Sequence, residues 1–299
     1  MKLVNKMENK KVACIVVTYN RLSLLKNAIY ALKKQSYENR TVFVVNNGST
    51  DGTKEWLDTQ TDMIVINQEN LGGAGGFYAG MKEAFDRGYE WIWLQDDDGE
   101  ADTKQLEKLI AGAERLNSKF VNALVCCIDN PDLLSFGLNC EGKAISTVSE
   151  AEKFSELYNA ICPFNGTLIH RDIIQNIGLV KREMFIWGDE VEYTNRVRKA
   201  GYKLYTITDA IHLHPKSRVS VSYIIPFVKV FGIIVPPANR RKIFFRNMGY
   251  NSRYAKSRGK LFNYMLYFAY FLIRLNIVGL ADFVSFYSKG IKDDYSDKV

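Results

Sequence analysis

The chain has 299 residues, which is long enough for one large domain and an appendage. Its 47% hydrophobic and 24% charged residues are ordinary for a globular protein. The five cysteines have no CxxC spacing, which argues against a disulfide framework and a structural zinc site and favours free thiols in a reducing cytosol.

The net charge of +7 is unevenly placed along the chain. Between Lys216 and Lys260 there are many basic residues and no acidic one. We therefore expect the C-terminal part to meet an anionic partner, which is a membrane surface, a nucleic acid or a phosphorylated substrate. The first residues have no apolar stretch after their lysines, so no secretory signal is expected. No segment reaches the ~18 uncharged apolar residues of a membrane-spanning helix.

In chain order, the N-terminal third alternates apolar, β-branched runs with segments of helical spacing. The runs predict buried strands at residues 12–17, 41–45, 63–66 and 91–94. The segments between them predict helices at residues 23–34, from 53 onward, and at 77–87. This alternation indicates an α/β fold with a mostly parallel sheet flanked by helices. In such sheets, ligands bind beyond the carboxyl ends of the strands, where each predicted strand here is followed by a polar loop.

The pattern is less regular from residue 105 to residue 201. Short strands are expected at 168–169 and 202–207, with a helix at 193–200 between them. After Pro215 the composition changes to basic and aromatic helices that continue to about Gly290. We therefore expect a catalytic domain at residues 1–215 and a helical region at residues 216–299.

Three adjacent acids, Asp96, Asp97 and Asp98, follow the fourth predicted strand. Crowded like charges are costly, and a divalent cation such as Mg²⁺ or Mn²⁺, which prefers carboxylate oxygens, would relieve that cost. Alternate residues of an extended backbone point the same way, so Asp96 and Asp98 are the expected metal ligands. Asp97 is left for a ribose hydroxyl or a structural hydrogen bond. The alternative is a solvated loop whose acids cap a helix.

Four glycines stand among the five residues from Gly72 to Gly76, after a predicted strand and before a predicted helix. Glycine permits close backbone approach, and a helix N-terminus offers free N–H groups to anions. The segment is neither a P-loop nor the dinucleotide fingerprint, since no Gly-Lys-Ser/Thr follows and it does not come after the first strand. A simple tight turn would need fewer glycines.

The acidic pair Asp189-Glu190 precedes a predicted helix. Such a carboxylate could be the base that activates a hydroxyl, although acids also favour the first turn of any helix. The histidines are His170, His212 and His214, and one of the last two could ligate a metal as neutral imidazole.

Together these motifs resemble the glycosyltransferases of family 2, which have the GT-A (Rossmann-like) fold. Residues 16–21, Val-Val-Thr-Tyr-Asn-Arg, are similar to the first nucleotide-binding strand of that family. Residues 46–53 are similar to a loop that begins with two acids, both of which are Asn here. The Asp-x-Asp metal motif of the family matches Asp96 and Asp98. The resemblance covers about residues 11–215.

Three segments are most similar to bacterial galactofuranosyltransferases, with surface-polysaccharide rhamnosyltransferases as close relatives: residues 70–77, 93–98 and 185–193. The resemblance implies that Glu190 is the catalytic base, with Asp189 in reserve, and that the metal ligands are Asp96, Asp98 and His214. It places the donor sugar or the acceptor at Asn165, Gly166 and Trp187. It places the donor nucleotide at Thr18, Asn20, Arg21, Asn47, Asn70, Gly72, Gly73, Gly76, Asp96 and Asp97.

The implied activity is an inverting, metal-dependent transfer of galactofuranose from UDP-galactofuranose to a lipid-linked glycan. This transfer would serve the synthesis of a cell-surface polysaccharide such as a capsule. The cofactor is Mn²⁺ or Mg²⁺. Two alternatives remain open: a rhamnosyltransferase that uses dTDP-rhamnose, and a non-catalytic protein that binds nucleotide sugars.

Basic residues alternate with aromatic ones after residue 239, and an apolar stretch follows from Leu261 to Tyr287. This composition favours peripheral contact of residues 240–288 with an anionic bilayer, at the inner face of the cell membrane. The alternative is a helical lid or a surface for homo-oligomers. Nucleic acid is not an expected partner, because no known binding motif accompanies the charge.

Overall fold

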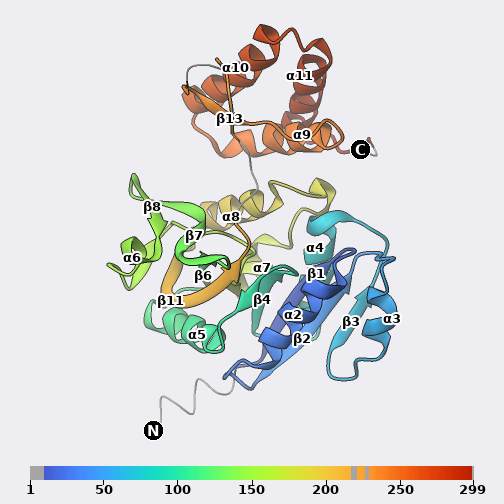
Figure 1. The fold of residues 1–299 in the computed structure, drawn as a ribbon, viewed down its shortest axis with the longest axis vertical. Helices are drawn as coiled ribbons and strands as arrows, with labels where there is room; N and C mark the ends of the chain where they lie inside the picture. Colours follow the sequence, from blue (N-terminus) through green and yellow to red (C-terminus); the bar gives the residue numbers. More distant parts are fainter. Residues whose placement is uncertain (1–9, 217–220, 226–228, 298–299) are drawn as a thin grey trace. The chain divides into compact units, whose positions relative to one another are not determined.

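The structure is a computed structural model that describes residues 10–216, 221–225 and 229–297 (Figure 1). The described residues form two compact units, and each is described by itself. The first unit contains residues 10–182 and 196–216, and the second contains residues 183–195, 221–225 and 229–297. The division into domains at residue 215 stays a prediction.

One mixed sheet of eleven strands organises the first unit. Its main path runs in the order β3 (Ile64–Asn67), β2 (Arg40–Asn46), β1 (Val12–Thr18), β4 (Trp91–Asp96), β10 (Thr167–His170), β6 (Phe120–Cys127), β11 (Leu204–His214) and β5 (Glu100–Ala101). Three further strands extend it, namely β7 (Asn130–Cys140) beside β6, β8 (Lys143–Thr147) beside β7, and β9 (Glu156–Tyr158) beside β11.

The four N-terminal strands are parallel, as predicted, and their carboxyl ends lie side by side. Thr18 at the end of β1 is paired with Asn46 at the end of β2, and Asn46 is paired with Asn67 at the end of β3. On the other side of β1, Val17 is paired with Asp96. The polar loops that follow these strands therefore start from one edge of the sheet.

The helices of the first unit are α2 (Leu22–Lys33), α3 (Thr53–Asp58), α4 (Gly72–Asp86), α5 (Gln105–Arg115), α6 (Val148–Ala151) and α7 (Arg171–Ile177). Buried residues of α2 and α5 form one apolar cluster with Val12, Cys14 and Val16 of β1. Helix α4 lies on the opposite face of the sheet, because Gly76 and Gly80 contact Val17 and Ile15. The sheet is therefore covered on both faces, which explains why every residue of β1 is buried.

The prediction that helix α4 begins at Phe77 was wrong, because it begins at Gly72 and includes all four glycines. A Cβ atom on Gly76 would overlap Val17, and one on Gly80 would overlap Ile15. The glycines thus let the helix approach β1 closely, which a count of turn residues does not reveal.

The middle of the chain is also more regular than predicted. Strands β6 and β7 and helix α5 lie in a region that the sequence pattern left largely unassigned. The strand expected at 202–207 continues to His214 as the single strand β11, whose pairing with β6 shifts register between Ile207 and Ile211.

The second unit begins with the short η1 turn (Arg182–Met184) and with helix α8 (Asp189–Lys199), whose last turn belongs to the first unit. It continues with β12 (Val221–Tyr223), β13 (Gly232–Ile234), α9 (Arg241–Asn251), the turn η2 (Ser252–Tyr254), α10 (Ser257–Ile273) and α11 (Ile277–Ile291). Its core is aromatic, with Phe245, Tyr267, Phe271, Phe283 and Tyr287 packed together. Within the described residues, no helix is both long and apolar enough to cross a membrane.

Helices α9 and α11 pack closely against each other at Gly290. A Cβ atom on Gly290 would overlap the carbonyl oxygen of Arg246. This oxygen belongs to the backbone of α9, so it could shift only if the helix itself were displaced. Gly290→Ala should therefore destabilise the protein by about 2 kcal/mol or more, seen as a lower midpoint of thermal unfolding.

Gly259→Ala is the matched control, because Gly259 lies in α10 and has no atom within 4 Å of the added Cβ. That variant should be about 0.5–1 kcal/mol more stable, because alanine favours a helix. Equal melting of both variants would contradict the proposed helix contact.

Candidate active site

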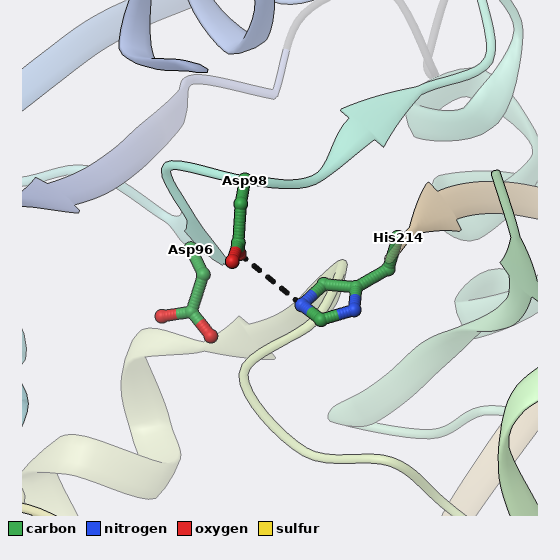
Figure 2. Close-up of side chains that lie close together, drawn as sticks. All are labelled: Asp96, Asp98 and His214. Carbon is green, nitrogen blue, oxygen red and sulfur yellow. Dashed lines mark ion pairs between the residues drawn. The ribbon is translucent and has the colours of Figure 1, made fainter. Parts of the chain in front are cut away.

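The candidate site lies at the carboxyl end of β4, where the three acids follow one another. Asp96 is the last residue of the strand, and Asp98 follows two residues later. His214 is the last residue of β11, three strands away in the sheet. Each of Asp96, Asp98 and His214 offers one possible ligand atom, and these atoms lie within 4.8 Å of one another (Figure 2).

The imidazole of His214 is oriented by its own loop. Its Nδ1 lies 2.7 Å from the carbonyl oxygen of Pro215, so Nδ1 carries a hydrogen and donates it. Its Nε2 lies 3.2 Å from Oδ1 of Asp98 (Figure 2). A backbone bond at one ring nitrogen leaves the other nitrogen turned toward the acids, as in many metal-bound histidines.

Asp97 has different partners from its two neighbours. The hydroxyl of Thr18 donates to its Oδ2 at 2.7 Å, and Arg21 donates to its Oδ1 at 3.1 Å. Arg21 also bonds Oδ2 of Asp98 at 2.9 Å. The buried carboxylate of Asp97 therefore ties the end of β1 to the end of β4, which corresponds to the structural alternative stated for this residue.

The charges of the site are strongly coupled. Burial, together with the nearby Asp98 and Asp97, raises the pKa of Asp96 to about 7. Burial alone would raise the pKa of Asp98, but its bond to His214 and the charge of Arg21 hold that pKa below its usual range. Burial would lower the pKa of His214, yet Asp98 raises it on balance.

These residues fit a divalent cation. Two carboxylate oxygens and one imidazole nitrogen converge, and this donor set suits Mn²⁺ and related ions. The pKa of Asp96 is raised because its carboxylate would be a buried negative charge that His214 and Arg21 offset only partly. A bound cation would neutralise this charge. The other histidine, His212, is fully buried, its Nδ1 lies 3.3 Å from Gln105 Oε1, and burial lowers its pKa to about 3.

The loops that follow β2 and β3 are joined by the side chain of Asn47. Its Nδ2 donates to the carbonyl of Gly72 at 2.7 Å, and its Oδ1 accepts from Leu71 N–H and from Gln68. Asn47 is buried, so this amide fixes the start of α4 against the end of β2. A carboxylate here could not donate to Gly72, which gives a physical reason for Asn in this chain.

The other residues expected to bind the nucleotide lie around the same edge. Asn20 has a positive φ of 54°, and its side chain accepts from Thr50 N–H at 2.7 Å. Asn70 accepts from Gly72 N–H at 3.0 Å, at the start of α4. Gly73 has open space around it, whereas Gly76 is packed on Val17. The structure thus brings these residues to the sheet edge that carries Asp96.

Asn165 and Gly166 precede β10 in the first unit. Gly166 has a φ of 70° and lies against Gln105, Ala123 and His212, so a side chain there would be strained and would clash. Asn165 is buried, and its Oδ1 has no hydrogen-bond partner among the described residues. Buried acceptors normally have a hydrogen-bond partner, so this oxygen can accept a hydrogen bond from a bound hydroxyl group.

The segment that carries Asp189 and Glu190 belongs to the second unit. Both acids lie in the first turn of α8, and the Glu190 carboxylate accepts from Gly188 N–H at 2.9 Å. Trp187 has a positive φ of 62°, and the guanidinium of Arg240 lies 5.5 Å from its ring centroid. The helix-capping interpretation of these acids therefore has a concrete basis, and it is compatible with a catalytic role.

Sequence reasoning missed Asn247 of α9, which holds this segment in place. Its buried Nδ2 donates to the carbonyls of Met184, Ile186 and Trp187 at 2.8, 3.0 and 2.8 Å. Asn251, one turn later, donates to Gly188 at 2.8 Å. The only available signal was a pair of amides at helical spacing within a basic, aromatic helix.

Comparison with known proteins identifies relatives of the chain. The sequence model of glycosyl transferase family 2 matches residues 13–178. A protein of Mycolicibacterium smegmatis named galactofuranosyltransferase GlfT1 is 33% identical over 220 residues, which cover 70% of this chain and 72% of that protein. A Shigella flexneri protein named dTDP-rhamnosyl transferase RfbF is 22% identical over 240 residues, which cover 80% of this chain and 78% of that protein.

Among solved structures, S. aureus TarS residues 1–349 align with a TM-score of 0.59 at 13% identity, over 95% of this chain and 82% of that chain. At this identity the likeness concerns the fold alone. It confirms the expected GT-A architecture, in which a mostly parallel sheet is flanked by helices.

The electrostatics of the site predict a pH-dependent affinity for Mn²⁺. A metal ion needs Asp96 deprotonated, and the pKa of this residue is raised to about 7. His214, whose pKa is also raised, must be neutral at Nε2. Affinity should therefore fall about tenfold or more for each pH unit below 7, with proton release on binding, as measured by calorimetry.

Two variants make this measurement specific. Asp96→Asn should bind Mn²⁺ weakly and should lose part of the pH dependence. Asp62→Asn, which removes an exposed carboxylate of the same unit, should bind like the parent. An affinity of the parent that stays flat from pH 5 to 8 would contradict the metal assignment.

Proposed function

The chain belongs to glycosyltransferase family 2, and from this premise we propose that it transfers galactofuranose from UDP-galactofuranose to a glycan acceptor. The convergence of Asp96, Asp98 and His214 at the carboxyl end of β4 carries the proposal. The similarity to a protein named galactofuranosyltransferase supports the choice of donor.

The proposed donor site surrounds this cluster. The nucleotide would lie along the ends of β1 and β2 and the start of α4, with Asn20, Arg21, Asn70, Gly72, Gly73 and Asp96 as its proposed neighbours. The other proposed donor-site residues, Thr18, Asn47, Gly76 and Asp97, are buried and would support these neighbours from below. The N–H groups of the first turn of α4 favour the diphosphate, because a helix N-terminus attracts anions. Arg21 adds a cation beside Asp97 and Asp98.

Asp96, Asp98 and His214 would hold a divalent cation, either Mn²⁺ or Mg²⁺. When bound, such a cation supplies Lewis-acid stabilisation of the departing diphosphate. Asn165, Gly166 and Trp187 are the proposed neighbours of the donor sugar or the acceptor. The orphaned Oδ1 of Asn165 is an acceptor that a sugar hydroxyl could satisfy.

Glu190 is the proposed base, with Asp189 in reserve. Its carboxylate would take the proton of the acceptor hydroxyl, whose oxygen then attacks the anomeric carbon in a single inverting displacement. The bond from Gly188 N–H keeps one carboxylate oxygen of Glu190 in place. Asn247 positions the backbone that precedes this residue.

The acceptor is proposed to be lipid-linked, in cell-surface polysaccharide synthesis at the inner face of the cell membrane. Peripheral contact with the membrane would come from residues 240–288. Their basic and apolar composition supports this location.

A rhamnosyltransferase that uses dTDP-rhamnose is the second candidate, supported by the similarity to RfbF. A screen of donor hydrolysis with several nucleotide sugars and Mn²⁺ decides between the two. Turnover of UDP-galactofuranose alone supports the first candidate, and turnover of dTDP-rhamnose alone supports the second. No turnover with any donor, despite tight binding of one, would point to a non-catalytic binding protein.

Two substitutions test the proposed chemistry. Asp98→Ala should abolish turnover because it removes a metal ligand, and Glu190→Gln should lower kcat by about 100-fold to 10,000-fold because it removes the base. Glu69→Gln, at an exposed position, is the control for the second change. If Asp189→Asn abolishes transfer while Glu190→Gln does not, the base is Asp189.

Asn247→Asp tests the positioning of the base segment. A carboxylate cannot donate to the three carbonyls that Asn247 now bonds, so this segment should shift and kcat should fall about tenfold to 100-fold. The KM of the donor should change little. Asn263→Asp, an exposed position in α10, should behave like the parent in the same steady-state assay, and parent-like kcat of Asn247→Asp would refute the role.

A further inference from the structure

Apolar side chains stand exposed along α10 and around the turn into α11. Leu275 in this turn is 80% exposed, Val278 and Ile277 in the next turn are 67% and 66% exposed, and Leu261 near the start of α10 is 64% exposed. Other large apolar side chains of the same two helices are also exposed, namely Phe262, Met265, Leu272, Ile273, Val284 and Ile291. We call Leu261, Met265, Leu272, Leu275, Ile277 and Val278 the outer stripe.

The stripe is a second apolar face of α10, distinct from the one in the core. Tyr267 and Phe271 point into the aromatic cluster with Phe245 and Phe283. Leu261, Met265 and Leu272 recur at helical spacing on the exposed side. A helix that is apolar on both faces buries only one of them within the described part of this unit. Exposed apolar surface of this extent marks an interaction site.

Charge around the stripe indicates what the site contacts. The sequence has no acidic residue from Ala210 to Ala281, so neither α10 nor the stretch of sequence before it contains a negatively charged side chain. Lys256 and Arg258 are exposed at the start of α10. Within the part of the chain that the structure describes, no ion pair involves Lys256 or Arg258, whereas Arg241 and Lys289 of the same unit pair with Asp282 and Asp297.

Two neighbouring features extend this basic and apolar character. The ring of Phe231 lies 5.8 Å from that of Phe262, which brings the exposed segment Lys229–Phe231 beside α10. A groove of about 250 Å³ at the start of α10 is lined by Ser257, Lys260, Leu261, Tyr264, Tyr287 and Ile291. A groove lined by a lysine, aromatic residues and aliphatic residues suits an anionic headgroup that is attached to an acyl chain.

We propose that the outer stripe inserts into the surface of an anionic lipid bilayer while Lys256 and Arg258 contact the headgroups. A second copy of the chain fits this surface less well, because paired stripes would bring their uncompensated basic groups together. The proposal deepens the membrane contact of the proposed function and rests on that function only for the lipid-linked acceptor.

The test is co-sedimentation of the full chain with vesicles, without donor or metal. We expect binding to phosphatidylcholine vesicles that contain about 30 mol% phosphatidylglycerol, and weaker binding to pure phosphatidylcholine. Leu275→Asp/Val278→Asp should weaken binding about 100-fold or more, because two inserted side chains become charged. Lys256→Glu/Arg258→Glu should weaken it at least about 20-fold, and only on anionic vesicles.

Tyr30→Asp/Phe154→Asp is the matched control, because these apolar side chains of the first unit are 59% and 45% exposed. This control should bind vesicles like the parent. All substituted side chains are exposed, and equal melting temperatures establish that each variant is folded.

Three results would overturn the proposal. The first is parent-like binding of Leu275→Asp/Val278→Asp, and the second is no binding of the parent to anionic vesicles. The third is a parent dimer, seen by light scattering without lipid, that this double variant dissociates, because the stripe would then belong to a second copy. Donor hydrolysis without vesicles is scored separately: Asp98→Ala should lose hydrolysis and keep vesicle binding, so failure of one proposal is distinguishable from failure of the other.

Discussion

Three carboxylates follow one another where β4 ends, and the repulsion between them is strong because Asp97 is buried and Asp96 and Asp98 are half-buried. The fold distributes this charge instead of avoiding it. Thr18 and Arg21 bond Asp97, and His214 pairs with Asp98. Asp96 is left with its proton affinity raised, which is the condition that a divalent cation relieves.

This arrangement requires residues that are far apart in the chain. Thr18 and Asp97 are 79 positions apart in the sequence. Asp98 pairs with His214, which comes from β11, three strands away in the sheet. The parallel strands bring their polar ends to one edge, and β11 adds His214 at the same edge. Glycine serves the same end, because Gly76 and Gly80 let α4 lie against β1 and bring its N-terminus to that edge.

Two amide side chains hold backbone segments for which the family resemblance points to acidic residues. These segments are the loop after β2 and the segment before Glu190. Asn47 joins the loops after β2 and β3 through a donor that aspartate lacks. Asn247 bonds three carbonyls in a segment where Phe185 and Trp187 have positive φ. Such backbone is strained and persists only where its surroundings hold it. The second unit thus contains both the segment of the proposed base and the outer stripe, which is the proposed lipid-binding face.

By itself, the sequence determined the order of strands and helices up to Asp96 and the parallel sheet, because buried β-branched runs and helical stripes are local patterns. It also singled out Asp96 and Asp98, since alternation along a strand is local too. Tertiary structure alone decided that Asp97 ties β1 to β4, that the glycines lie within α4, and that Asn247 holds the segment before Glu190. It also decided which face of α10 is exposed. These features depend on contacts between distant residues, and a sequence pattern contains no information on which of two apolar faces finds a partner.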